Sequence, residues 1–295
     1  MMQTPSPKSN FKVSWQFLFT LLMYGFMYLP ILILAVYSFN ASRFSTTWEG
    51  FSFKWYQALF KDLRIFDALQ DSLTVALAAV AVSAVLGTMM AVGLAKYRFP
   101  GKGFYQGTAY LPLIIPDIAI AVATLVFFSS IFGLLAPIVQ SLNVALVNME
   151  VSFSLPQPAL SIGTVIIAHV VFCLSYIAVV VSTRLTNLDP HLEEAALDLG
   201  ATPFQAFIKV LLPELIPAIL SGCLLAFILS MDDLLISGFT AGSGTTTLPM
   251  LIYSRVRTGV RPDINALSVV LILMSAFLAL ASEYMRYRGD RKRLS

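Results

Sequence analysis

Long apolar runs recur along the chain, and they constrain its fold more than any other feature. Six runs of about 20 residues or more contain few charged side chains. They lie at roughly 14–39, 72–95, 104–132, 159–183, 214–238 and 264–287. Because hydrocarbon offers backbone groups no water to bond, such runs must form helices that cross a bilayer. A transmembrane barrel would instead show short segments of alternating polarity. We therefore predict an all-α integral membrane protein with about six transmembrane helices.

Composition excludes several other classes of protein. The 295 residues are 58% hydrophobic and only 12% charged, with a mean hydropathy of +0.80, which is far from a soluble domain. The net charge of +3 comes from Lys and Arg at the ends of apolar runs, so we expect no nucleic-acid partner. Cys173 and Cys223 are the only cysteines and signal no disulfide framework. His169 and Cys173 share a helix face but lack a third ligand, so packing is favoured over metal binding.

Basic residues also predict the orientation of the chain. Lys8 and Lys12 precede an apolar run that is too long for a signal peptide and has no cleavage site after it, so we expect a retained first span. Further basic residues follow the second and last runs, namely Lys96, Arg98, Lys102, Arg286, Arg288, Arg291, Lys292 and Arg293. The positive-inside rule then places both termini in the cytoplasm.

This orientation gives a simple domain layout. We expect a cytoplasmic N-terminus at 1–13, a transmembrane domain at 14–287 with a cytoplasmic loop at about 184–213, and a basic cytoplasmic tail at 288–295. A separate soluble domain does not fit between the apolar runs. The role of the predicted outer loop at about 133–158 stays open.

Two irregular stretches interrupt the predicted helices. Pro112 and Pro116 lie near the start of the third run, where proline removes a backbone donor and breaks or kinks a helix. Irregular backbone at membrane depth usually lines a cavity. The segment from Phe239 to Pro262 is also rich in glycine and proline, and we predict an outer loop that is able to dip back into the membrane.

The cytoplasmic segment at 189–213 has the local signals of two short helices. Asp189 can cap a helix that starts at Pro190, and Gly200 can close it in a left-handed turn. Thr202 and Pro203 then repeat the cap-and-proline start, so a second helix is predicted to run toward Leu212. These signals predict an ordered pair of helices with a tight elbow, exposed to a cytoplasmic partner.

The same segment carries a specific resemblance. Glu194-Ala195-Ala196, then three residues, Gly200, nine residues and Val210-x-Leu212-Pro213 resemble the E-A-A-x₃-G-x₉-I-x-L-P signature of binding-protein-dependent ABC importer permeases. Val in place of Ile is the only departure. The resemblance implies a type I ABC importer architecture in which the loop couples to an ATPase through Glu194, Ala195, Ala196, Gly200, Leu212 and Pro213. A plain amphipathic helix after a span is the alternative.

Further segments narrow the resemblance to the second permease subunit of spermidine/putrescine importers. They are Ser38-Phe39-Asn40-Ala41-Ser42-Arg43-Phe44, Trp48-Glu49-Gly50-Phe51, Lys54-Trp55-Tyr56, Pro116-Asp117, Ser230-Met231-Asp232-Asp233 and Asn265-Ala266-Leu267. This resemblance implies a bacterial inner-membrane permease that imports polyamines and is not itself an enzyme. Its implied partners are the lipid bilayer, a second homologous permease, two ATPase subunits and a periplasmic polyamine-binding protein. ATP and Mg would belong to the partner ATPase, and this chain would bind no cofactor.

Three acids lie within or beside apolar runs, namely Asp117, Asp232 and Asp233. An ionised carboxylate at mid-bilayer costs at least about 2.5 kcal/mol, so such residues usually face water or a bundle interior. A substrate path for a polycation would use them, with at most one of the two neighbouring acids facing it. Two alternatives stay open. Asp117 can instead cap the helix after Pro116. Asp232 or Asp233 can pair with Arg255, Arg257 or Arg261.

Other functions fit the sequence less well. The chain has no G-x-x-x-x-G-K-[ST] phosphate loop and no H-E-x-x-H or G-x-S-x-G motif for an intramembrane protease. A secondary polyamine transporter or channel would explain intramembrane acids but has no need of the elbow at 189–213. An ABC permease for another small cationic or polar solute is a further alternative.

Overall fold

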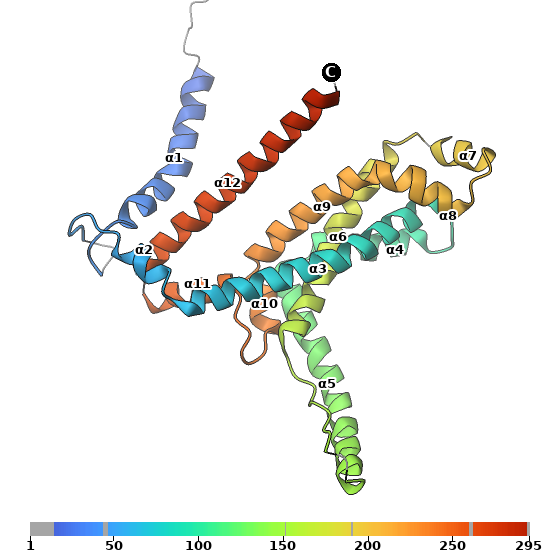
Figure 1. The fold of residues 1–295 in the computed structure, drawn as a ribbon, viewed down its shortest axis with the longest axis horizontal. Helices are drawn as coiled ribbons and strands as arrows, with labels where there is room; N and C mark the ends of the chain where they lie inside the picture. Colours follow the sequence, from blue (N-terminus) through green and yellow to red (C-terminus); the bar gives the residue numbers. More distant parts are fainter. Residues whose placement is uncertain (1–14, 44–46, 151, 190, 260–261, 294–295) are drawn as a thin grey trace, which may run out of the picture. The chain divides into compact units, whose positions relative to one another are not determined.

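The computed structural model describes residues 15–43, 47–150, 152–189, 191–259 and 262–293, the last sixteen of these as backbone only. Helices make up most of the described chain (Figure 1). The chain divides into two compact units. The first takes in residues up to Asp62 and from Ser254 onward, and the second is Leu63–Tyr253.

The first unit joins the two ends of the chain. It contains α1 (Trp15–Tyr37), α2 (Lys54–Leu59) and α12 (Pro262–Arg293), with α12 packed on both α1 and α2. Trp55, at the start of α2, is buried, and its Nε1 donates to the carbonyl of Asn40 over 2.7 Å. This bond ties α2 to the residues that follow α1.

The core of the second unit consists of three long helices, α3 (Leu63–Lys96), α6 (Ile162–Thr186) and α9 (Leu212–Asp232). Small residues allow these helices to approach each other closely. A Cβ on Gly87 would lie 2.9 Å from the carbonyl oxygen of Leu174, and one on Gly222 would lie 3.2 Å from the Cα of Ile177. Membrane helices associate by such close packing because lipid is as apolar as their side chains, so the hydrophobic effect does little to bring them together.

The third apolar run is broken where its prolines predict. It forms α4 (Lys102–Tyr110), a 3₁₀ turn (Leu111–Leu113) and then α5 (Asp117–Asn148). The prediction of a loop from residue 133 is wrong, because α5 continues to Asn148. The helix continues through Gly133 and accommodates Pro137 without ending.

The fifth apolar run is also broken, at a place where no proline predicts it. After α9, Asp233 is extended (φ −70°, ψ 123°), and the short helix α10 (Leu235–Thr240) packs on α5 and α6. The predicted span at 214–238 is therefore two helices. The prediction of an irregular loop from Phe239 to Pro262 is also wrong in part, since it contains α11 (Leu248–Thr258).

The stretch between α10 and α11 is held against the start of α3. The backbone N–H of Thr246 donates to Asp71 over 3.0 Å, and that of Leu248 donates to the Ser72 hydroxyl over 2.7 Å. Gly242 lies directly on the backbone before α6, where an added Cβ would come within 1.7 Å of the Leu160 oxygen. This stretch is therefore seated on the helices of its own unit.

The number of apolar helices agrees with the predicted spans. Within the described residues, five helices are long and apolar enough to cross a membrane, and Pro262–Phe277 adds a shorter apolar stretch. About six spans fit this structure. The predicted cytoplasmic N-terminus at 1–13 lies outside the described residues, and part of the predicted tail at 288–295 continues α12.

Candidate functional site

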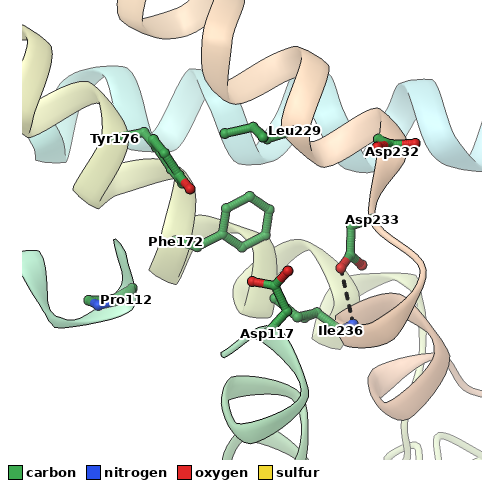
Figure 2. Close-up of a pocket in the computed structure, with 8 residues that line it drawn as sticks. All are labelled: Pro112, Asp117, Phe172, Tyr176, Leu229, Asp232, Asp233 and Ile236. Carbon is green, nitrogen blue, oxygen red and sulfur yellow. Dashed lines mark hydrogen bonds between the residues drawn. The ribbon is translucent and has the colours of Figure 1, made fainter. Parts of the chain in front are cut away.

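A pocket of about 130 Å³ in the second unit brings the three predicted acids together (Figure 2). It lies where the broken third and fifth runs meet α6. Its lining residues are Pro112, Asp117, Phe172, Tyr176, Leu229, Asp232, Asp233 and Ile236. The two helix breaks therefore lie at a cavity, as irregular segments of membrane proteins usually do.

Asp233 is bound tightly to its surroundings. Its Oδ1 accepts from the N–H of Ile236 over 3.1 Å, and its Oδ2 accepts from the N–H and hydroxyl of Ser237 over 2.7 and 2.9 Å. Its Oδ2 also lies 3.2 Å from Nε2 of His169, and only 9% of the Asp233 side chain is exposed. Asp233 therefore caps α10 and is paired with α6 at the same time.

His169 connects three helices through its ring. Its Nδ1 lies 2.7 Å from the Ser230 hydroxyl on α9, and its Nε2 lies 3.0 Å from the Ser237 hydroxyl on α10. The side chain is fully buried, and buried polar groups of this kind are normally satisfied by such bonds. The structure thus places His169 in a polar network, and within the described residues no group of three His, Cys, Asp or Glu side chains is arranged for a metal ion.

Asp117 and Asp232 differ from Asp233. Both residues are exposed, and neither carboxylate has a hydrogen bond or ion pair within the described part of the chain. Asp117 is the first residue of α5 and makes no cap hydrogen bond. Arg255 pairs instead with Asp62 at 2.5 Å and with Asp263 at 3.5 Å, while Arg261 lies outside the described residues.

The remaining lining is mostly apolar or aromatic. Phe172 and Tyr176 lie one turn apart on α6, and Leu229 and Ile236 come from the two sides of the α9–α10 break. Figure 2 shows Asp117 beside Phe172, with Asp232 and Asp233 where α9 ends. Such a lining offers contact to methylene groups, and rings attract cations at their faces. The pocket therefore combines unpaired negative charge with apolar surface.

The predicted loop at 184–213 forms the elbow expected from the sequence. The N–H of His191 donates to Asp189 Oδ1 over 2.9 Å at the start of α7 (His191–Asp198), while Pro190 lies outside the described residues. Gly200 follows with a φ of +87°. Thr202 then caps α8 (Pro203–Ala206) in a capping box with Gln205. These contacts confirm the local signals of caps and glycine in the sequence.

The second helix of the elbow does not end at Leu212. A π-helical turn (Phe207–Leu211) carries the chain from α8 directly into α9. Pro213 lies in the first turn of α9, directly after this wider turn. Proline has no N–H to donate, and the regular backbone hydrogen bonds of the α-helix are already interrupted there. The loop and the span that ends at the pocket are thus one continuous helical path.

The predicted coupling residues lie on an accessible surface. Glu194, Ala195, Gly200 and Pro213 are exposed, whereas Ala196 is buried and Leu212 is half-buried. Two apolar side chains not predicted for this surface, Leu199 and Phe204, are 89% and 74% exposed. Exposed apolar side chains around a glycine elbow are typical of a docking surface for another protein.

An ion pair joins the elbow to the end of α3. Lys96, at the end of α3, lies 2.5 Å from Glu193 on α7, and its ammonium lies 5.8 Å from the ring centre of Phe207. His191 Nδ1 lies 3.0 Å from Glu194 Oε2. The hydrogen bond to Glu194 and the nearby negative charges raise the pKa of His191 above its usual 6.5.

Comparison with known proteins now decides the family. The model for "Binding-protein-dependent transport system inner membrane component" matches residues 83–294. The chain belongs to this family. The permease is 40% identical over 282 residues to the putrescine transport system permease protein PotI of Escherichia coli (strain K12), covering 95% of this chain and 93% of that protein. It is 36% identical over 261 residues to the spermidine/putrescine transport system permease protein PotC of the same strain, covering 88% and 89%.

Solved structures agree on the fold of the permease. A chain of a bacterial ABC transporter that imports the acidic polysaccharide alginate matches with a TM-score of 0.67 at 17% identity, covering 93% of this chain and 94% of that one. The same kind of transporter in complex with an alginate pentasaccharide-bound periplasmic protein matches with a TM-score of 0.63. At this identity the likeness establishes the fold of an ABC importer permease and does not identify the substrate.

Proposed function

We propose that this permease imports putrescine or spermidine into the cytoplasm past the pocket lined by Asp117, Asp232 and Asp233. The observation that carries the proposal is an acidic membrane pocket in a chain 40% identical, over 95% of its length, to a putrescine permease. A polyamine loses hydration when it enters a membrane protein, and carboxylates offset that loss. Phe172 and Tyr176 would contact its methylenes and ammonium groups.

The cytoplasmic elbow is proposed as the contact with an ATPase subunit. Glu194 would face the partner, Ala195 and Ala196 would permit close approach, and Gly200 would fix the elbow angle. Leu212 and Pro213 would join that movement to α9, which runs from the loop to the pocket. ATP and Mg would be bound by the ATPase and not by this chain.

The assembly follows from the same proposal. This chain would form a heterodimer with a second homologous permease, on which two ATPase subunits act from the cytoplasm, with both termini of this chain on that side. A periplasmic polyamine-binding protein would deliver the substrate. A secondary transporter would not need the exposed elbow, so copurification of an ATPase with this chain would separate the two functions. Uptake of a different small cation or polar solute is the other alternative.

Uptake by the reconstituted complex tests the proposal. ATP-dependent entry of radiolabelled putrescine or spermidine into proteoliposomes is expected, and Asp117→Asn with Asp232→Asn should lower it by at least about tenfold, or roughly 1.4 kcal/mol at the barrier. Asp67→Asn is the matched control, since Asp67 is an exposed acid of α3 outside the pocket. Equal uptake by the double variant and the control would refute the path, and ATP-independent uptake would favour a secondary transporter.

A further inference from the structure

Two neighbouring acids of the pocket have very different surroundings. Asp232 is exposed, and no described residue binds its carboxylate, while Asp233 is held from α6 and α10. Asp232 is the last residue of α9, and Asp233 is the next residue, where the chain leaves the helix. The contacts of Asp233 therefore hold the backbone directly after Asp232.

Most of the acceptor capacity of Asp233 is already used within the protein. A carboxylate offers about four lone-pair sites, two on each oxygen. The Ser237 N–H, the Ser237 hydroxyl and the His169 ring all lie at Oδ2, and the Ile236 N–H donates to Oδ1. An amine would find one acceptor site, on Oδ1, of a side chain that is only 9% exposed. Asp232 and Asp117 have no such restriction.

The hydrogen bonds also fix one proton of His169. The Ser237 hydroxyl donates to Asp233 Oδ2, so its oxygen can only accept from the ring. Nε2 of His169 thus faces two acceptors, Ser237 Oγ at 3.0 Å and Asp233 Oδ2 at 3.2 Å, and must carry a proton. The other ring nitrogen lies 2.7 Å from Ser230 Oγ, in the last turn of α9.

We propose that His169 is a positioning residue of the substrate path. It joins Ser230 before the α9–α10 break to Asp233 and Ser237 after it, and so holds the break in the one geometry that presents Asp232 to the pocket. Asp233 serves this clamp and does not bind the substrate. The inference rests on the proposed function only in taking the pocket as the path.

Chemical labelling tests the geometry without any substrate. In the assembled complex, an Asp232→Cys variant is treated with a cationic methanethiosulfonate reagent, in a background with Cys223→Ser. Cys173 is buried, and labelling of the same chain without Asp232→Cys is subtracted. Wild-type His169 should give rapid labelling, because the side chain at position 232 is exposed in the pocket.

Two amide substitutions at position 169 form a matched pair. His169→Gln places an N–H near the position of Nε2, where it can reach Asp233, whereas His169→Asn reaches only the position of Nδ1 near Ser230. We expect His169→Gln to retain the wild-type labelling rate and His169→Asn to lower it by at least about tenfold, since a hydrogen bond to a buried carboxylate is lost. His169→Phe, if it accumulates in the membrane, should behave like His169→Asn.

Equal labelling in wild type, His169→Asn and His169→Gln would overturn the positioning role. So would equal losses in the two amide variants, because a general need for a histidine in the core would produce them. Uptake of radiolabelled putrescine is measured separately in chains that keep Asp232. If uptake is absent there while the Asn and Gln variants still differ in labelling, the polyamine path fails and the clamp stands.

Discussion

The elbow at 189–213 and the acidic pocket lie in the same unit, but they are built in different ways. In the elbow, contacts at the turns come from residues a few positions apart, such as Asp189 with His191 and Thr202 with Gln205. In the pocket, the decisive contacts join residues far apart, since His169 bonds Ser230 and Ser237 over separations of 61 and 68 residues. The elbow is therefore specified locally, and the pocket only by the packed helices.

This difference has a consequence for mutation. A change in the elbow should alter its shape and leave the helix bundle intact, because few side chains outside it depend on it. A change at the buried contacts near the pocket should disturb several helices at once. Gly200 in the elbow and Gly242 just after α10 offer a direct comparison, since Gly200 lies in open space and Gly242 lies against backbone.

The largest effect is expected at Gly242. With Gly242→Ala, the new Cβ would lie 1.7 Å from the Leu160 oxygen, so the stretch after α10 must move. Overpacking of this kind costs about 1–3 kcal/mol or more, and we expect a clear fall in Tm and in the amount of folded permease. Gly238→Ala is the control, because a Cβ there meets no described atom within 4 Å. Equal melting temperatures for the two variants would contradict this account.

At Gly200 we expect loss of transport without loss of fold. Its φ of +87° is unfavourable for a residue with a Cβ, by about 1–2 kcal/mol for most and more for a β-branched one. Gly200→Val should lower ATP-driven uptake by at least about tenfold at equal membrane abundance. Gly200→Ala should be less severe, and Glu194→Lys should act like Gly200→Val by reversing charge at the partner surface. Wild-type uptake by both Gly200→Val and Glu194→Lys would refute the coupling role.

A smaller effect is expected at the tie between the elbow and α3. Lys96 and Glu193 lie 2.5 Å apart with side chains 25% and 27% exposed, so solvent screens the pair in part. Lys96→Gln should reduce uptake per ATP hydrolysed by about two- to threefold, because a partly exposed pair contributes about 1 kcal/mol or less. Arg184→Gln breaks a more exposed pair with Glu214 and should change this ratio less. A larger effect from Arg184→Gln would argue against a specific role for Lys96.

The smallest effect depends on pH. The pKa of His191 is raised by Glu194, so the pair stabilises α7 fully below the unfolded pKa of about 6.5 and loses this contribution as pH rises through the folded pKa. Limited proteolysis of the elbow should be slower for wild type than for His191→Gln at pH 6, by less than about twofold for so exposed a pair, and equal at pH 8. A difference in proteolysis rate between wild type and His191→Gln that grows as pH rises would contradict this account.

The sequence predicts the elbow well because its signals are adjacent residues with known local preferences. Capping residues and a glycine determine the helix ends there, and the structure places all of the described ones as expected. The breaks at Pro112 and Pro116 are predictable for the same reason. Coupling to an ATPase stays a prediction, because it depends on a partner chain.

Other features depend on contacts that no local pattern reveals. Helical geometry predicts that Asp232 and Asp233 point in different directions, but the choice between them depends on His169. The break after α9 has no proline, so the fifth run looks like one span in the sequence. The extension of α5 to Asn148 is hidden because Gly133 and Pro137 are local signals of a helix end.

The central claim is that the pocket carries the cation while the elbow carries the coupling. It is tested most directly by measuring ATP hydrolysis and polyamine uptake side by side in the same proteoliposomes. Asp117→Asn with Asp232→Asn should lower uptake by at least about tenfold and leave ATP hydrolysis near the wild-type rate, whereas Gly200→Val should lower both. If both variants reduced uptake and hydrolysis in the same proportion, the two regions would not have separate roles, and the account would be contradicted.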